Sequence, residues 1–318
     1  MKKSILIFSL LSASLLTVPL LTACGGSDEL PPSFVSSSSQ ASSANSSGGT
    51  SSFSDRAIYQ VPTDYSSPEY AVSSDNINDA EVVKEGNFLF YVFDDHVTVA
   101  GYDGTDTDVT IPDTVAGRPV TKIGESAFRS PLLCKSIHIP ETVEVIEHHA
   151  FMDLSLEYVN FPAGLKEIEK GAFSGGCSFE TLELPESITI IREGAFSDCG
   201  FKNIILPQSI TTIENLAFSG CASLEHIEIP SSVQYIGGFT FYGCTSLHDI
   251  TIPDGIGSIE DYTFYSCSSL SSVTVPDSVG SIGEAAFLGC SSLQEISIPG
   301  DCYCHYAAFS ENTTVIKR

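Results

Sequence analysis

The amino-acid sequence predicts a solenoid, a β-rich α/β repeat superhelix of about nine units of 22–23 residues with a parallel β-sheet on one face. Prolines recur every 22 or 23 residues between Pro140 and Pro299, and from Pro140 to Pro276 a phenylalanine follows each proline by 11 residues. Each proline ends a short alternation of apolar and polar residues, as in LHDITIP, residues 247–253, which is typical of a short strand. Stacked units of this kind share one continuous apolar core.

The first element is a leader over residues 1–23. A basic MKK precedes a long apolar run and then LTAC, an order that is typical of a secretion signal. Leu21-Thr22-Ala23-Cys24 resembles the bacterial lipobox, which implies a lipoprotein signal peptide and lipidation at Cys24. The alternative is an ordinary signal peptide with a chance cysteine.

Residues 24–79 are expected to form a lipidated, disordered tether, because 11 of the 19 residues from Ser36 to Ser54 are serine. Such a stretch cannot bury enough apolar area to offset its ordering entropy. Residues 80–110 are expected to form an N-terminal β capping region, with a hairpin of residues 88–93 and 96–102. Residues 311–318 supply a C-terminal cap with a last strand, because an open sheet edge needs covering.

Residues 111–310 carry the repeats. The unit CTSLHDITIPDGIGSIEDYTFYSC, from Cys244 to Cys267, resembles the BspA-like leucine-rich repeats of bacterial surface lipoproteins, and the likeness extends over about residues 105–310. The resemblance implies a leucine-rich-repeat fold and a role in adhesion, with extracellular or cell-surface proteins as partners.

Six cysteines share one column, three or four residues after the phenylalanine: Cys177, Cys199, Cys221, Cys244, Cys267 and Cys290. Small, apolar, buried thiols are the favoured interpretation, because side chains in a ladder point the same way and aim poorly at one another for disulfides. Disulfides and metal binding remain alternatives. Cys302 and Cys304 are expected to pack in the end cap, with a redox or metal role as the alternative.

No motif of a hydrolase, a nucleotide-binding loop or a zinc protease occurs, so the sequence predicts a protein without catalysis, cofactor or metal. The formal net charge of −26 argues against nucleic acid as a partner.

Two surfaces are candidates for binding. One is the concave strand face, with outward residues Tyr158, Asn160, Glu183, Asn203, Ile205, His226, Glu228 and Asp249. The other lies near the convex side, where Leu216, Phe239, Tyr242, Tyr262 and Tyr265 stack across units, because contiguous apolar residues often mark interaction sites. A solvated polar face and mutual packing of the aromatic rings are the respective alternatives.

The expected protein is therefore exported, lipid-anchored to the bacterial cell envelope and surface-exposed, with a monomeric repeat head that mediates protein binding or adhesion. The alternative is an envelope-facing module for glycan capture or structural assembly. In that case the aromatic residues would stack on sugar rings.

Overall fold

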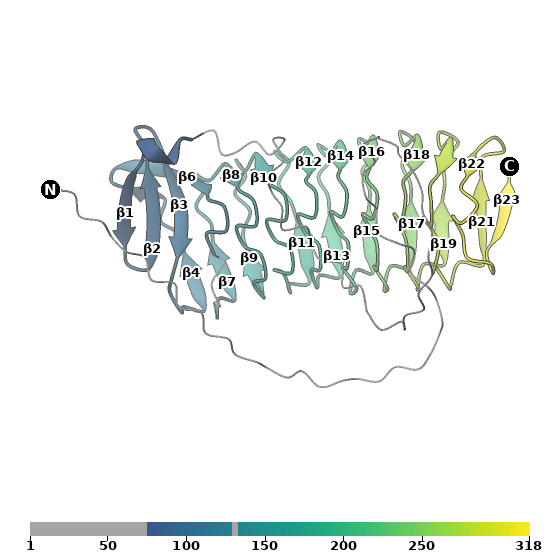
Figure 1. Cartoon of the computed structure of the whole chain (residues 1–318), viewed down its shortest axis with the longest axis horizontal. Coiled ribbons are helices and arrows are strands. Elements are labelled where there is room, and N and C mark those ends of the chain that lie inside the picture. Colours follow the sequence, from purple (N-terminus) through teal and green to yellow (C-terminus); the bar gives the residue numbers. More distant parts are fainter. Residues whose placement is uncertain (1–74, 129–132) are drawn as a thin grey trace, which may run out of the picture. The chain divides into compact units, whose positions relative to one another are not determined.

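The computed structural model describes residues 75–128 and 133–318. The predicted leader, its lipidation site at Cys24 and most of the predicted tether lie outside the described residues. The described part consists of short strands joined by turns, and its one helical element is a 3-10 helix, Ile77–Asp79. Figure 1 shows the turns of the chain following one another along a single row.

Each repeat contributes two short strands. These form two ladders along the stack (Figure 1), and each ladder consists of several short sheets of parallel strands. The first ladder contains the strands that end before the prolines, together with the last strand of the chain: β4 (Asp108–Thr110), β7 (Ser136–His138), β9 (Tyr158–Val159), β11 (Thr181–Glu183), β13 (Asn203–Ile205), β15 (His226–Glu228), β17 (Asp249–Thr251), β19 (Ser272–Thr274), β21 (Glu295–Ile298) and finally β23 (Thr314–Lys317). The predicted parallel-stranded solenoid is confirmed.

The second ladder was not predicted. From β8 to β20 it is built from the apolar residue that follows each proline by six, together with its neighbour, and β6 and β22 extend it at the two ends. Its strands are β6 (Arg118–Ile123), β8 (Val145–Ile146), β10 (Glu167–Ile168), β12 (Ile190–Ile191), β14 (Thr212–Ile213), β16 (Tyr235–Ile236), β18 (Ser258–Ile259), β20 (Ser281–Ile282) and β22 (Tyr303–Cys304). The isoleucine of each strand from β8 to β20 is buried, so both ladders face one core.

A column of phenylalanines fills the space between the ladders. Successive rings from Phe128 to Phe309 have centroids 5.0–6.1 Å apart, and all but the last are fully buried. The backbone beside the rings forms a further ladder. The amide of Phe218, for example, donates to the carbonyl of Thr240 in the next unit at 3.1 Å. Each unit is therefore held to the next by ring packing and by main-chain hydrogen bonds.

Both ends of the stack carry additional strands. At the start, β1 (Glu81–Glu85), β2 (Phe88–Val92) and β3 (Val97–Tyr102) run antiparallel, and β3 then pairs in parallel with β6. A small antiparallel pair joins β5 (Thr114–Val115) to β6. At the other end β23 pairs with β21. These strands cover core residues that would otherwise meet water.

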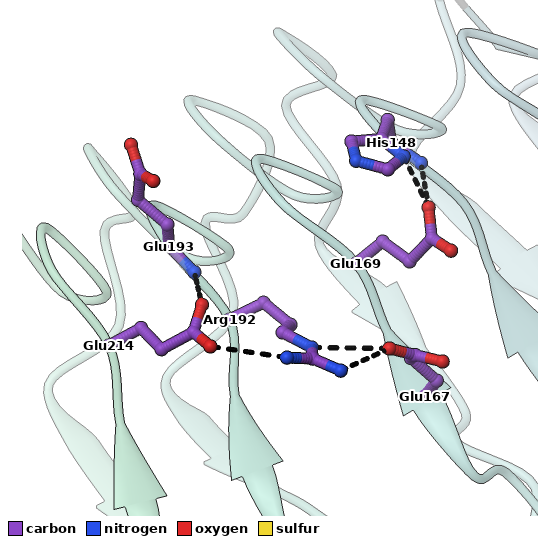
Figure 2. A network of polar contacts seen from close by, with 6 residues as sticks. All are labelled: His148, Glu167, Glu169, Arg192, Glu193 and Glu214. Atoms are coloured by element: carbon purple, nitrogen blue, oxygen red, sulfur yellow. Dashed lines mark hydrogen bonds and ion pairs between the residues drawn. The ribbon is translucent and has the colours of Figure 1, made fainter. Parts of the chain in front are cut away.

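Polar side chains tie neighbouring units together at the turns after the second ladder (Figure 2). Arg192 lies between two carboxylates, with Nη2 2.7 Å from Glu167 Oε1 and Nη1 3.1 Å from Glu214 Oε1. Glu214 also accepts the amide of Glu193 at 2.9 Å. His148 pairs with Glu169, whose carboxylate also accepts the amide of His148. The hydrogen bond with Glu169 raises the pKa of His148.

The cysteine column lies beside the phenylalanines and is fully inside the core. The thiols of Cys199, Cys221, Cys244, Cys267 and Cys290 each donate to the carbonyl oxygen of the phenylalanine in the preceding unit, at 3.0–3.3 Å. Every cysteine of the described residues is a free thiol. Burial raises the pKa of Cys290 to about 12. Because the thiolate is the reactive form of cysteine, this favours a packing role for the column over a nucleophilic or metal-binding role.

Candidate functional site

Strand pairing in the first ladder stops between β15 and β17 and between β19 and β21 within the described residues, and it is interrupted likewise between β9 and β11. Strand β9 pairs with β7 on one side, and β11 pairs with β13 on the other, but β9 and β11 do not pair with each other. An open cleft of about 520 Å³ lies at this interruption. That volume falls within the range of roughly 300–1,000 Å³ that is common for ligand sites.

Aromatic rings and carboxylates line this cleft. The rings are Tyr158, Phe161 and Phe179, and the carboxylates are those of Glu141, Glu157 and Glu183. The side chain of Tyr158 is 48% exposed, whereas Phe161 and Phe179 are half-buried against the core. The lining contains no lysine, arginine or histidine.

At the interruption, two inward positions that are usually aliphatic in the repeat unit carry phenylalanine. Phe161 takes the position before the proline that is aliphatic in the other units, and it packs edge-on against Phe173 at 5.5 Å. Phe179 takes the usual leucine position and stacks on Phe201 at 6.3 Å. The exposed parts of both rings supply the apolar floor of the cleft.

Asn160 was expected to point outward from the strand face, but its side chain bonds to the backbone of the preceding unit. Its Oδ1 accepts the amide of Ile139 at 2.8 Å, and its Nδ2 donates to the carbonyl of Ile139 at 2.7 Å. The side chain thus takes the place of a backbone partner where the regular β7–β9 pairing has ended. Asn160 supports the edge of the cleft and is absent from its lining.

Of the other expected strand-face residues, Tyr158 and Glu183 lie together at the cleft. The rest lie farther along the same ladder: Asn203 and Ile205 on β13, His226 and Glu228 on β15, and Asp249 on β17. His226 Nδ1 lies 3.7 Å from Asp249 Oδ1, with both side chains more than 60% exposed, so solvent weakens this pair. Among residues 75–128 and 133–318, no group of three metal-ligating side chains is assembled.

The aromatic residues of the second predicted surface form a cluster of stacked rings. Phe239 stacks on Tyr262 with ring centroids 4.7 Å apart, and Tyr242 stacks on Tyr265 at 5.1 Å. Tyr262 is buried, and its hydroxyl donates to Glu284 at 3.2 Å. Leu216, Phe239, Tyr242 and Tyr265 are half-buried. These rings therefore direct much of their surface toward one another.

Three residues of this surface, nine positions after successive prolines, have a left-handed backbone conformation. Leu216, Phe239 and Tyr262 have φ of 61°, 59° and 57°, where earlier units place Gly171 and Gly194. A left-handed conformation costs a residue with a β-carbon roughly 1–2 kcal/mol. The stacking of Phe239 on Tyr262 and the burial of Tyr262 act against this cost in two of the three units.

Sequence reasoning missed the cleft because its lining comes from three successive units. Glu141, Phe161 and Phe179 belong to no surface column of the repeat pattern. The signal that could have found them is the replacement of aliphatic residues by phenylalanine at two nearby inward positions.

The model of the BspA type leucine-rich repeat region matches residues 121–200 and 189–316, in six copies. The chain belongs to this family. The resemblance expected from the repeat unit is thereby confirmed for this BspA-type protein. No curated protein matches the chain.

Several solved structures are similar to this BspA-type protein. The leucine-rich repeat protein TpLRR of T. pallidum is 24% identical, covering 70% of this chain and 91% of its own, with a TM-score of 0.45. A leucine-rich cell surface protein of Faecalibacterium prausnitzii is 28% identical, covering 76% and 88%, with a TM-score of 0.49. The pneumococcal vaccine antigen PcpA is 18% identical, covering 75% and 85%, with a TM-score of 0.44.

In the part of this BspA-type protein that the structure describes, no helix has both the length and the apolar character needed to cross a bilayer.

Proposed function

We propose that this BspA-type protein is a lipid-anchored binding protein of the bacterial cell surface, and that it recognises another protein through the cleft of the first ladder. The observation that carries this proposal is the cleft between β9 and β11, where exposed aromatic and acidic side chains surround an interrupted sheet. The role is binding without catalysis.

Aromatic side chains support this assignment. Tyrosine is enriched at protein-binding surfaces because it combines apolar area with a hydroxyl group, and it loses little conformational entropy on binding. Between β7 and β19, the large apolar side chains that point outward from the first ladder are Tyr158, which is 48% exposed, and Ile205, which is 53% exposed. Together with the cleft they give the strand face an apolar centre within a polar rim, which is the usual anatomy of an interface.

Binding is tested with purified matrix and cell-surface proteins against the full chain. We expect saturable binding of at least one protein, and the double variant Tyr158→Ala, Glu183→Gln should weaken it by about tenfold or more. The matched control is Tyr235→Ala with Glu228→Gln, which changes the same residue types outside the cleft lining. Equal losses in the two double variants would contradict the assignment to the cleft.

The lipid anchor is tested separately. Incorporation of labelled palmitate into the chain should be abolished by Cys24→Ala, and protease treatment of intact cells should remove the wild-type repeat region. Failure of the label to enter the wild-type chain would contradict lipidation.

The alternative is glycan capture, and the three aromatic rings of the cleft favour it, because sugar rings stack on aromatic faces. Binding of the full chain to immobilised glycans, lost in the Tyr158→Ala variant, would support this alternative in place of a protein partner.

A further inference from the structure

The occupant of the cleft can be specified by chemistry. We propose that the cleft binds an extended protein segment that carries a basic side chain, arginine in preference to lysine. This inference rests on the proposed protein-binding function and adds the class of partner.

The charge of the cleft favours a basic partner. Three carboxylates line the cleft, and no basic side chain lines it. Two of them have partners within the protein. Glu157 Oε1 lies 2.9 Å from Lys135 Nζ, and Glu141 Oε2 accepts the amide of Ala163 at 3.3 Å.

Glu183 differs from these two residues. Its carboxylate makes no ion pair or hydrogen bond with any described residue, and the residue is exposed at the cleft. A carboxylate beside aromatic rings attracts a cation, and a guanidinium group satisfies both of its oxygens at once through two parallel hydrogen bonds. Arginine is therefore a better match than lysine at this position.

The aromatic rings of the cleft also favour a guanidinium group. A cation held against Glu183 lies within a cleft that Tyr158, Phe161 and Phe179 also line. Guanidinium groups bind to the faces of aromatic rings, and such contacts strengthen where water is excluded. The combination of rings and carboxylates therefore selects a planar cation over an aliphatic or an acidic side chain.

The backbone at the cleft favours an extended segment. The residues just before the two strands are bridged, Leu156 to Cys177, but no main-chain hydrogen bond among the described residues joins β9 to β11, so the facing edges of these two short strands are unpaired. Unpaired edges accept an extended segment as an added strand, with the main chain supplying affinity and the side-chain contacts supplying specificity. A free basic amino acid would leave these backbone groups unused.

The test uses a fluorescein-labelled hexapeptide of alternating threonine and arginine, titrated with the full chain and followed by fluorescence anisotropy. We expect saturable binding that weakens as salt is raised, because partly exposed charges are screened. A peptide with citrulline in place of arginine keeps the shape and loses the charge. It should bind at least about tenfold more weakly, and a lysine peptide should be intermediate.

The variants locate the site. Glu183→Gln should weaken peptide binding by about tenfold or more, and Tyr158→Ala should also weaken it. Glu228 is the matched control, because Glu183, Ile205 and Glu228 are neighbours in register along β11, β13 and β15. Glu228→Gln should change the dissociation constant by less than about twofold. Thermal melting of both glutamine variants should match the wild type, since both residues are exposed.

Three results would overturn the inference. In the first, the citrulline peptide binds as tightly as the arginine peptide. In the second, Glu183→Gln and Glu228→Gln weaken peptide binding equally. In the third, the arginine peptide does not bind even at low salt. If a protein partner still requires the cleft after any of these results, the proposed function stands and only the basic segment is wrong. If glycans bind the cleft and the arginine peptide does not displace them, both the basic segment and the protein partner are wrong.

Discussion

The buried thiols of the cysteine column should react with alkylating reagents far more slowly than an exposed cysteine. Burial raises the pKa of Cys290 from an ordinary 9.0 to about 12. At pH 8 a thiol of pKa 12 is ionised to about one part in 10⁴, against about one part in ten for a pKa of 9. Because the thiolate is the reactive species, ionisation alone slows alkylation by about a thousandfold. Burial of Cys221, Cys244 and Cys267 raises their pKa well above the usual range too.

The assay is iodoacetamide labelling of the native protein at pH 8, followed by peptide mass spectrometry at each cysteine. Cys304 is half-buried and serves as the internal reference. It should label first, and the column thiols should label only through unfolding, which populates roughly 10⁻³–10⁻⁶ of the molecules. In guanidinium chloride all of these thiols should label at similar rates.

The reasoning would be refuted by native labelling of Cys244 or Cys290 within about tenfold of the Cys304 rate. It would also be refuted if these thiols became reactive only after treatment with a reductant, because that result would reveal disulfides in the column. Either outcome would mean that the cysteines are more than packing residues.

Three further predictions concern stability. Phe218→Ala removes a fully buried ring from the stack and should lower the free energy of unfolding by about 3–5 kcal/mol in denaturant titrations; a loss below about 1 kcal/mol would contradict the column's role. Asn160→Ala leaves two backbone groups without their partner and should cost about 1–3 kcal/mol, whereas the control Asn203→Ala should have little effect. The pKa of His148 is raised by its hydrogen bond with Glu169, so the stabilisation is complete below the unfolded pKa near 6.5 and is lost as pH rises through the folded value. His148→Gln should therefore lower the melting temperature at pH 5 and leave it nearly unchanged at pH 9; the same loss at both pH values would assign His148 a purely steric role.

Much of the fold could be predicted from the sequence because a solenoid converts sequence columns into spatial neighbours. The phenylalanines and cysteines recur at nearly constant intervals, so each phenylalanine ring stacks on its counterpart in the next unit, and each column thiol from Cys199 to Cys290 bonds to the phenylalanine carbonyl of the preceding unit. The alternation before each proline likewise located the strands of the first ladder. Such interactions depend on adjacent units only.

The candidate site was less predictable. Alternation places Asn160 on the outward face, yet its amide bonds to the backbone of Ile139. Periodicity places Tyr262 in a surface column, yet its ring stacks on Phe239 and is buried. In both cases a contact with one particular neighbour decides where the side chain lies, and that contact is invisible in the repeat pattern.

The sequence by itself determined the length of the repeat, the residues of the core and the strands of the first ladder, because buried apolar residues must recur with the period of the stack. Only the tertiary structure decided that a second ladder forms and that the first ladder opens between β9 and β11. The physical reason is that pairing between strands depends on the relative displacement of successive units. Side-chain size, turn geometry and backbone hydrogen bonds together set this displacement, and no single column of residues records it.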